Sequence, residues 1–256
     1  MPREDAGART LMSGGGDFAL FDGDRGDALL LDGCCRSYRL AASDDPAPVF
    51  AAIEAELAAG RWVAMAADYA LAASFESAAA VVPTAGPVMR AWAFERGEWL
   101  DAKAVTGFLA ARVAALPEQQ RAAGIADLLP GVSAARHAEQ VRQIRNWIAD
   151  GDCYQINLTF PMRCRVYGSP LALYQRLRPR QPVRYGGYLT VGAEAILSFS
   201  PELFFERQAD RVLTRPMKGT AARGRTADED EAQRAALISS PKERAENIMI
   251  VDLLRN

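Results

Sequence analysis

Apolar residues mark out short clusters and one stretch of helical spacing in the first third of the chain. The clusters at 28–31 and 38–40 predict short strands on either side of a turn at Gly33. Apolar residues recur every three or four positions over 46–60, which predicts a helix opened by Asp-Asp-Pro and closed by glycine. The apolar run at 61–69 then predicts a buried strand.

The middle of the chain is punctuated by Ala, Pro and Gly from residue 72 to residue 132. Within it we predict a strand at 88–94 and a helix around 105–115. Ser133 is placed to cap a further helix that continues to Asp150.

The C-terminal half alternates between short strands and helices. A long strand is predicted over 153–166, and Ser169 with the following proline opens a short helix. Because several strands follow one another before the last helices, the pattern indicates an α+β fold with antiparallel sheets flanked by helices. The later predicted strands lie at 185–190, 195–200, 203–207 and 212–215, and the helices at 228–238 and 242–254.

Three regions are predicted along the chain. Residues 1–16 combine a Gly run with charges and few apolar groups, which predicts disorder. The Pro130-Gly131 dipeptide is typical of a linker. It divides an N-terminal region, 17–132, from a C-terminal region, 133–256, in which the candidate chemistry lies.

Composition and charge exclude some classes of function. With 256 residues, 50% of them hydrophobic, the chain can bury a sizeable core, and its net charge of -2 gives no positive field for nucleic acid or anionic lipid. No apolar run is long enough to cross a bilayer and no secretory signal is present, so we expect a cytoplasmic protein. Its four cysteines fit no metal or disulfide pattern and are expected to be reduced and buried.

Polar side chains alternate with apolar ones over residues 151–159. On a strand, Gln155 and Asn157 would share one face with Cys153 and Thr159. Taken from the pattern alone, a solvent-facing strand is the better explanation of that face, and a ligand site is the alternative.

Two further candidates place a reactive group beside apolar residues or glycine. Glu202 follows Ser-Pro and precedes Leu-Phe-Phe, surroundings that disfavour a charged carboxylate and suit a general acid, although a carboxylate at a turn can also reach water. Lys218 is one of only three lysines, and a lysine can become a nucleophile where arginine cannot. Gly219 permits close approach of a ligand, and Thr220 offers a hydroxyl.

The fourth candidate is a pair of carboxylates near the C-terminus. Glu243 and Glu246 are three residues apart, so a helix presents both on one face, as a hard cation such as Mg²⁺ requires. Two ligands do not complete a site, and an exposed acidic face is the alternative.

Together and in this order, four motifs resemble the chorismate-utilising enzymes, which include anthranilate, aminodeoxychorismate, isochorismate and salicylate synthases. The resemblance covers roughly residues 134–256, about half of the chain. It implies the chorismate-binding fold of anthranilate synthase component I. The motifs are GDCYQINLT, SFSPELFF, TRPMKGTAARG and KERAENIMIVDLLRN.

The resemblance implies a role for each candidate residue. Gln155 stands where the water-activating members carry lysine, which is similar to the ammonia-using members. Lys218 stands where anthranilate-forming members carry alanine, and is similar to the lysine of the members that form 4-amino-4-deoxychorismate. Lys218 would attack the chorismate ring while Glu202 protonates the departing hydroxyl. Mg²⁺ would be bound by Glu246 directly and by Glu243 through water. Gln155, Asn157, Gly219 and Thr220 would contact the substrate.

The resemblance also implies a partner, a pathway and an incomplete domain. Ammonia would come from a glutamine amidotransferase subunit, in the synthesis of para-aminobenzoate and folate. In the family the motif that ends here at Asn256 reads on into the rest of the catalytic domain, so we expect a truncated domain with little activity of its own. The rivals are anthranilate synthase component I and a non-catalytic remnant that docks an amidotransferase.

Overall fold

The protein was analysed as a computed structural model that describes residues 8–9, 16–76 and 86–255. The chain forms two compact units. One combines Met1–Val105 with Gln181–Asn256, and the other is Thr106–Arg180. The predicted disorder of residues 1–16 falls outside the described residues, except for the short strand at 8–9 and Gly16.

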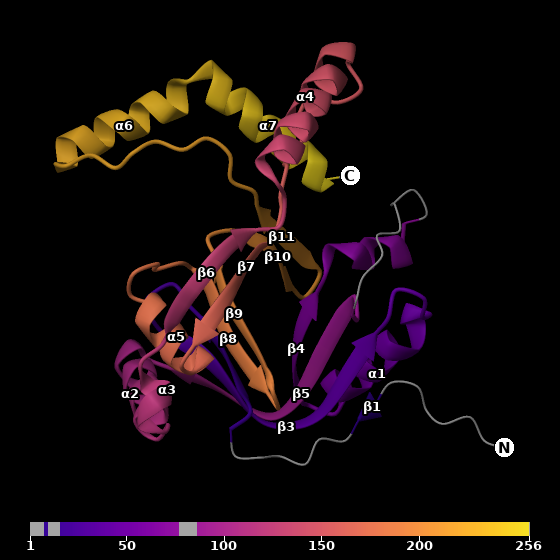
Figure 1. Cartoon of the computed structure of the whole chain (residues 1–256), viewed down its shortest axis with the longest axis vertical. Helices are drawn as coiled ribbons and strands as arrows, with labels where there is room; N and C mark the ends of the chain where they lie inside the picture. Colours follow the sequence, from indigo (N-terminus) through magenta and orange to yellow (C-terminus); the bar gives the residue numbers. More distant parts are fainter. Residues whose placement is uncertain (1–7, 10–15, 77–85, 256) are drawn as a thin grey trace. The chain divides into compact units, whose positions relative to one another are not determined.

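The first unit contains a seven-stranded sheet in which every pair of neighbours is antiparallel (Figure 1). Its strand order is β4-β5-β3-β2-β8-β9, and β1 pairs with β3. The central strands are rich in branched and aromatic residues, which suit a pleated surface. The strands are β1 (Ala8–Arg9), β2 (Phe18–Asp22), β3 (Ala28–Leu40), β4 (Trp62–Ala67), β5 (Met89–Leu100), β8 (Tyr185–Val191) and β9 (Glu194–Ser200).

This sheet curls around a hydrophobic core. Strands β4 and β8 are separated by three strands in the sheet order, yet their buried residues belong to one cluster. The cluster includes residues of each strand between them, so it runs across the curled sheet from β4 to β8. The buried members are Ala19, Leu31, Cys34, Ala64, Trp92, Phe94, Leu189 and Val191.

The prediction of two strands around a turn at Gly33 was wrong. Residues 28–40 form the single strand β3, which pairs with β5 along its whole length. Gly33 has a φ of 74°, which glycine adopts at no steric cost, and the pairing register shifts between Cys34 and Arg36. The glycine therefore accommodates an irregularity within a strand and does not end it.

Helix α1 (Pro46–Ala58) covers part of the sheet and agrees with the prediction. The Asp45 side chain accepts a hydrogen bond from the N–H of Ala47 and caps the helix. Ile53 is buried in a second cluster with residues of β3 and β5. Strand β4 follows, but only Ala64 is buried in it, so the predicted buried strand is an edge strand.

The second unit is built mainly from helices around a two-stranded sheet of β6 (Gly124–Pro130) and β7 (Met162–Tyr167). The predicted N-cap Ser133 accepts a hydrogen bond from the N–H of Arg136, and Gly151 ends α4 with a φ of 84°. Helix α2 begins in the first unit and continues into this one. The helices are α2 (Ala102–Ala114), α3 (Glu118–Arg121), α4 (Ala134–Asp150) and α5 (Pro170–Leu177).

The predicted long strand at 153–166 was also wrong. Only Met162–Tyr167 forms a strand, while residues 153–161 have no regular secondary structure. Strand β7 pairs with β6 only from Met162 onward, and Pro161 just before it has no N–H to donate. Alternating polarity does not make a strand where no neighbouring strand continues the ladder of hydrogen bonds.

The first unit also contains the hairpin of β10 (Leu203–Gln208) and β11 (Arg211–Arg215), followed by α6 (Ala227–Ser239) and α7 (Pro241–Arg255). These four elements were all predicted. The α+β class with curled antiparallel sheets and flanking helices is confirmed. Within the described part of the chain, no helix has the length and apolarity to span a membrane.

Candidate active site

The β10–β11 hairpin brings the Glu202 motif to the Lys218 loop. Leu203 pairs with Arg215, so the residues just before β10 and just after β11 meet at one end of the hairpin. There Glu202 Oε1 accepts a hydrogen bond of 2.9 Å from the backbone N–H of Met217. The carboxylate predicted to be a general acid thus contacts the residue next to the predicted nucleophile, Lys218.

Ser200 fixes the turn that carries Glu202. Its hydroxyl donates to the Glu202 carbonyl at 3.1 Å and accepts from the Glu202 N–H at 3.4 Å. Glu202 is half-buried, but Phe204 and Phe205 are 74% and 55% exposed and contact each other edge to face. The expected apolar surroundings are therefore not formed by these two rings.

The Lys218 loop also approaches helix α7 closely. Gly219 has a φ of 81°, and a Cβ at this position would lie 2.6 Å from Glu243 Oε2. Both the backbone conformation and the space favour glycine over every other residue. The half-buried Glu243 carboxylate therefore lies against the loop that carries Lys218.

Glu243 and Glu246 share one cation in this structure. The ammonium of Lys242 lies 3.3 Å from Glu243 Oε1 and 3.4 Å from Glu246 Oε1. Among the described residues no group of three or more His, Cys, Asp or Glu comes together as a metal site. Two carboxylates nevertheless fit Mg²⁺, which often binds protein through one or two carboxylates and completes its shell with water and substrate.

Gln155 and Asn157 belong to the other compact unit, Thr106–Arg180. Both lie in the irregular segment before β7, where Gln155 is half-buried and Asn157 is exposed. The contacts of Glu202 and Glu243 described above lie within the first unit. Thr220 follows Gly219 in the Lys218 loop and is exposed.

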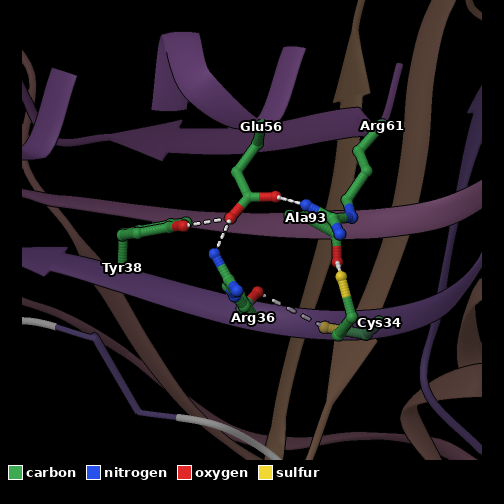
Figure 2. Close-up of polar contacts among 7 residues, drawn as sticks. Cys34, Arg36, Tyr38, Glu56, Arg61 and Ala93 are labelled. Atoms are coloured by element: carbon green, nitrogen blue, oxygen red, sulfur yellow. Dashed lines mark hydrogen bonds and ion pairs between the residues drawn. The ribbon is translucent and has the colours of Figure 1, made fainter. Parts of the chain in front are cut away.

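A second polar cluster, centred on Glu56, was missed by the sequence analysis (Figure 2). The Glu56 side chain is only 2% exposed and comes from α1. Its Oε1 accepts hydrogen bonds from the Tyr38 hydroxyl at 2.5 Å and Arg36 at 2.8 Å, and its Oε2 accepts one from Arg61 at 2.5 Å. The available signal was its position three residues after Ile53, on the buried face of the helix.

The electrostatics of this cluster favour a charged Glu56. Burial by itself raises the pKa of Glu56, but the hydrogen bonds from Tyr38, Arg61 and Arg36 outweigh burial and hold the pKa below its usual value. Burial also raises the pKa of the nearby Cys34 thiol to about 12. All four cysteines are free, as predicted, but only Cys34 is buried, whereas Cys35 and Cys153 are partly exposed and Cys164 is exposed.

The family of this chain follows from a match that spans more than half of it. Residues 88–256 match the family described as chorismate binding enzyme. This chain belongs to the chorismate-binding enzymes. The match includes all four motifs from which the resemblance was inferred, so the predicted family is confirmed.

The similar proteins within the chorismate-binding enzymes include two kinds of enzyme, named for different reactions. Aminodeoxychorismate synthase component 1 of Salmonella typhimurium is 38% identical over 120 residues, 47% of this chain and 26% of that protein. Anthranilate synthase component 1 of Thermus thermophilus is 36% identical over 137 residues, 54% of this chain and 30% of that protein. The matched segments thus span less than a third of these relatives.

A solved structure of the same family has a similar fold. Anthranilate synthase component I from Streptococcus pneumoniae matches with a TM-score of 0.62 and 19% identity. The match covers 100% of this chain and 62% of that one. This likeness supports the fold and carries no information on the reaction.

Proposed function

We propose that this chain is part of an aminodeoxychorismate synthase, which converts chorismate and ammonia to 4-amino-4-deoxychorismate. The observation that carries the proposal is the hydrogen bond from the Met217 N–H to Glu202, because it joins the acid motif to the lysine loop. By the family resemblance, lysine at position 218 is typical of the members that form aminodeoxychorismate, and alanine of those that form anthranilate. Lys218 therefore favours the aminodeoxychorismate reaction over the anthranilate reaction for this chain.

In the proposed reaction, the unprotonated amine of Lys218 bonds to ring carbon 2 of chorismate. The ring double bonds shift and the hydroxyl at carbon 4 leaves as water with a proton from Glu202. Ammonia then bonds to carbon 4 and the amine of Lys218 departs from carbon 2. Glu202 Oε1 already accepts the Met217 N–H, so the proton to be donated is placed on Oε2.

Magnesium is proposed at Glu243 and Glu246. When bound, the metal would neutralise a carboxylate of the substrate. Because Glu243 lies against Gly219, a metal held by Glu243 would keep the substrate carboxylate beside the Lys218 loop. Gln155, Asn157 and Thr220 are proposed to contact the substrate, and ammonia is proposed to come from a glutamine amidotransferase partner.

The second candidate is anthranilate synthase component I, because the Thermus thermophilus relative carries that name at 36% identity. The two reactions differ in the ring position that receives nitrogen. In the proposed mechanism, only amination at carbon 4 uses a covalent bond to Lys218.

The test compares products of chorismate, ammonium and Mg²⁺ by mass spectrometry and anthranilate fluorescence. It uses the 256-residue chain and the same chain continued through the remainder of the family domain. The continued chain is expected to form 4-amino-4-deoxychorismate, and Lys218→Ala and Glu202→Gln are each expected to lower kcat by about 100-fold or more. Lys103→Ala removes an exposed lysine of α2 that has no role in the proposed reaction, so this control should keep full activity.

Three outcomes contradict the proposal in different ways. Anthranilate as the main product favours the second candidate. Full activity of Lys218→Ala removes the covalent step. Capture of an amidotransferase without any chorismate turnover by the continued chain favours a docking role.

A further inference from the structure

The further inference concerns Lys242, a residue to which the proposed reaction gives no role. Lys242 is the second residue of α7, in its first turn. The N-terminal end of a helix carries partial positive charge, so a lysine ammonium there is unfavourable unless carboxylates offset it. Its ammonium lies at the two carboxylates of the proposed magnesium site.

Both contacts of Lys242 are made within helix α7, one to the next residue and one to the residue four positions on. A lysine that precedes glutamate by four residues is the weaker orientation of a helical ion pair. Lys242 nevertheless lies within 3.4 Å of Glu246 and within 3.3 Å of Glu243 at the same time. Each contact uses Oε1 of the glutamate, so one ammonium takes an oxygen from both carboxylates.

We propose that Lys242 is the counter-ion of the Glu243–Glu246 pair. Its ammonium lies at the two carboxylates when no metal is bound and moves away when Mg²⁺ binds. The inference rests on the magnesium site of the proposed function. The Lys242 side chain is 76% exposed, whereas the carboxylates of Glu243 and Glu246 are 22% and 33% exposed. The lysine can therefore swing into water without uncovering buried surface, while the two carboxylates stay in place.

The charges explain why departure is favourable once the metal is present. A divalent ion interacts with the two carboxylates about twice as strongly as a single ammonium at the same distance. A retained ammonium would repel the metal, so the two cations exclude each other. Lys242 then lowers the apparent affinity for Mg²⁺ and keeps the like-charged carboxylates together in its absence.

The first experiment measures binding of Mg²⁺ to the 256-residue chain by calorimetry, with Mn²⁺ and its paramagnetic resonance as a second probe. Lys242→Met is expected to bind either ion about three- to tenfold more tightly than the unmodified chain. The gain should shrink as salt is raised, because the residues are partly exposed. Lys103→Met, which removes the same charge from helix α2, is the control and should leave the affinity unchanged.

The second experiment follows the lysine itself. Reaction of each amine with an acylating reagent is mapped by mass spectrometry with and without saturating Mg²⁺. Lys242 is expected to react at least twofold faster when the metal is bound, whereas Lys103 should not change. Constant reactivity of Lys242 in bound protein would overturn the inference.

The outcomes separate this inference from the function on which it rests. If Glu243→Gln with Glu246→Gln abolishes metal binding but Lys242→Met leaves it unchanged or weaker, the counter-ion role is wrong and the metal site stands. If the double glutamine variant binds metal normally, both proposals about the metal fail. If neither the unmodified chain nor Lys242→Met binds metal, the inference is likewise overturned.

Discussion

The seven-stranded sheet and the segment from β10 to α7 belong to one compact unit, yet they bury their side chains to very different extents. Strands β2, β3 and β5 contain residues with no exposed surface, such as Ala19, Leu40 and Phe94. From residue 201 to residue 254, none is buried. Glu202, Lys218, Glu243 and Glu246 all lie in that second stretch. The core of the unit is therefore in the sheet, and the candidate chemistry lies on a surface that a ligand can reach.

The comparison extends to two carboxylates with cationic partners, Glu56 on helix α1 beside the sheet and Glu243 on α7. Glu56 is 2% exposed and has three hydrogen-bond partners, so its role is structural. Glu243 is 22% exposed and its ammonium partner is 76% exposed. Burial fixes the first arrangement, while the proposed exchange of cations at the second requires the exposure that Lys242 has.

The largest expected effect is the loss of both arginines around Glu56. Arg36→Ala with Arg61→Ala leaves a buried carboxylate with only the Tyr38 hydroxyl, which is expected to lower the free energy of unfolding by about 3 kcal/mol. Urea unfolding followed by circular dichroism measures this change.

Arg96→Ala is the matched control for the arginine pair. It breaks the ion pair of 2.9 Å with Asp32 on the same sheet, where both partners are exposed. The expected loss is below about 1 kcal/mol. Equal losses in the two proteins would show that the Glu56 cluster contributes no more than an ordinary surface pair.

A smaller effect is expected for Glu56→Gln, and it depends on pH. At pH 7 the variant loses charge-assisted hydrogen bonds and should be less stable by about 2 kcal/mol. Because the pKa of Glu56 is held below its ordinary 4.5 in the folded protein, the stabilisation by its charge is present above pH 4.5 and is lost as pH falls through the folded pKa. Stability measured from pH 7 down to pH 3 should therefore show the two proteins converging in acid.

The smallest change in stability is expected in the exposed segment from β10 to α7. Gly219→Ala is expected to cost about 1 kcal/mol, because alanine is disfavoured at a φ of 81° and its Cβ meets Glu243 Oε2. The displaced carboxylate should also weaken Mg²⁺ binding severalfold, measured by calorimetry. Gly192→Ala, at a φ of 61° in open space, carries the backbone cost alone and should leave metal binding unchanged.

The sequence predicted those elements whose signals are local. The caps of α1 and α4, at Asp45 and Ser133, and the hairpin at 203–215 follow from neighbouring residues and form as expected. Gly33 was misread because a positive φ serves a turn and an irregular strand equally well. The segment 153–161 was misread because a strand depends on a partner that lies elsewhere in the chain.

The candidate site was predictable in its residue types and only partly in its contacts. The family motifs selected Glu202, Lys218 and Glu243, and the hairpin register accounts for the approach of Glu202 to Met217. The Glu56 cluster escaped prediction because two of its partners come from β3 and the third, Arg61, lies just before β4, and only the fold brings β3 to α1. The position of the Lys242 ammonium depends on a side-chain conformation, which composition and spacing do not specify.

The pairing of β2 with β8, in which Phe18 lies opposite Thr190, has a consequence for synthesis. A ribosome releases the N-terminal strands long before residues 185–200 exist, so the curled sheet cannot close until most of the chain has emerged. During that interval the apolar residues of β2 and β3 lack their neighbours on β8. Such long-range pairing favours slow folding, and the incomplete chain on the ribosome is therefore expected to bind chaperones.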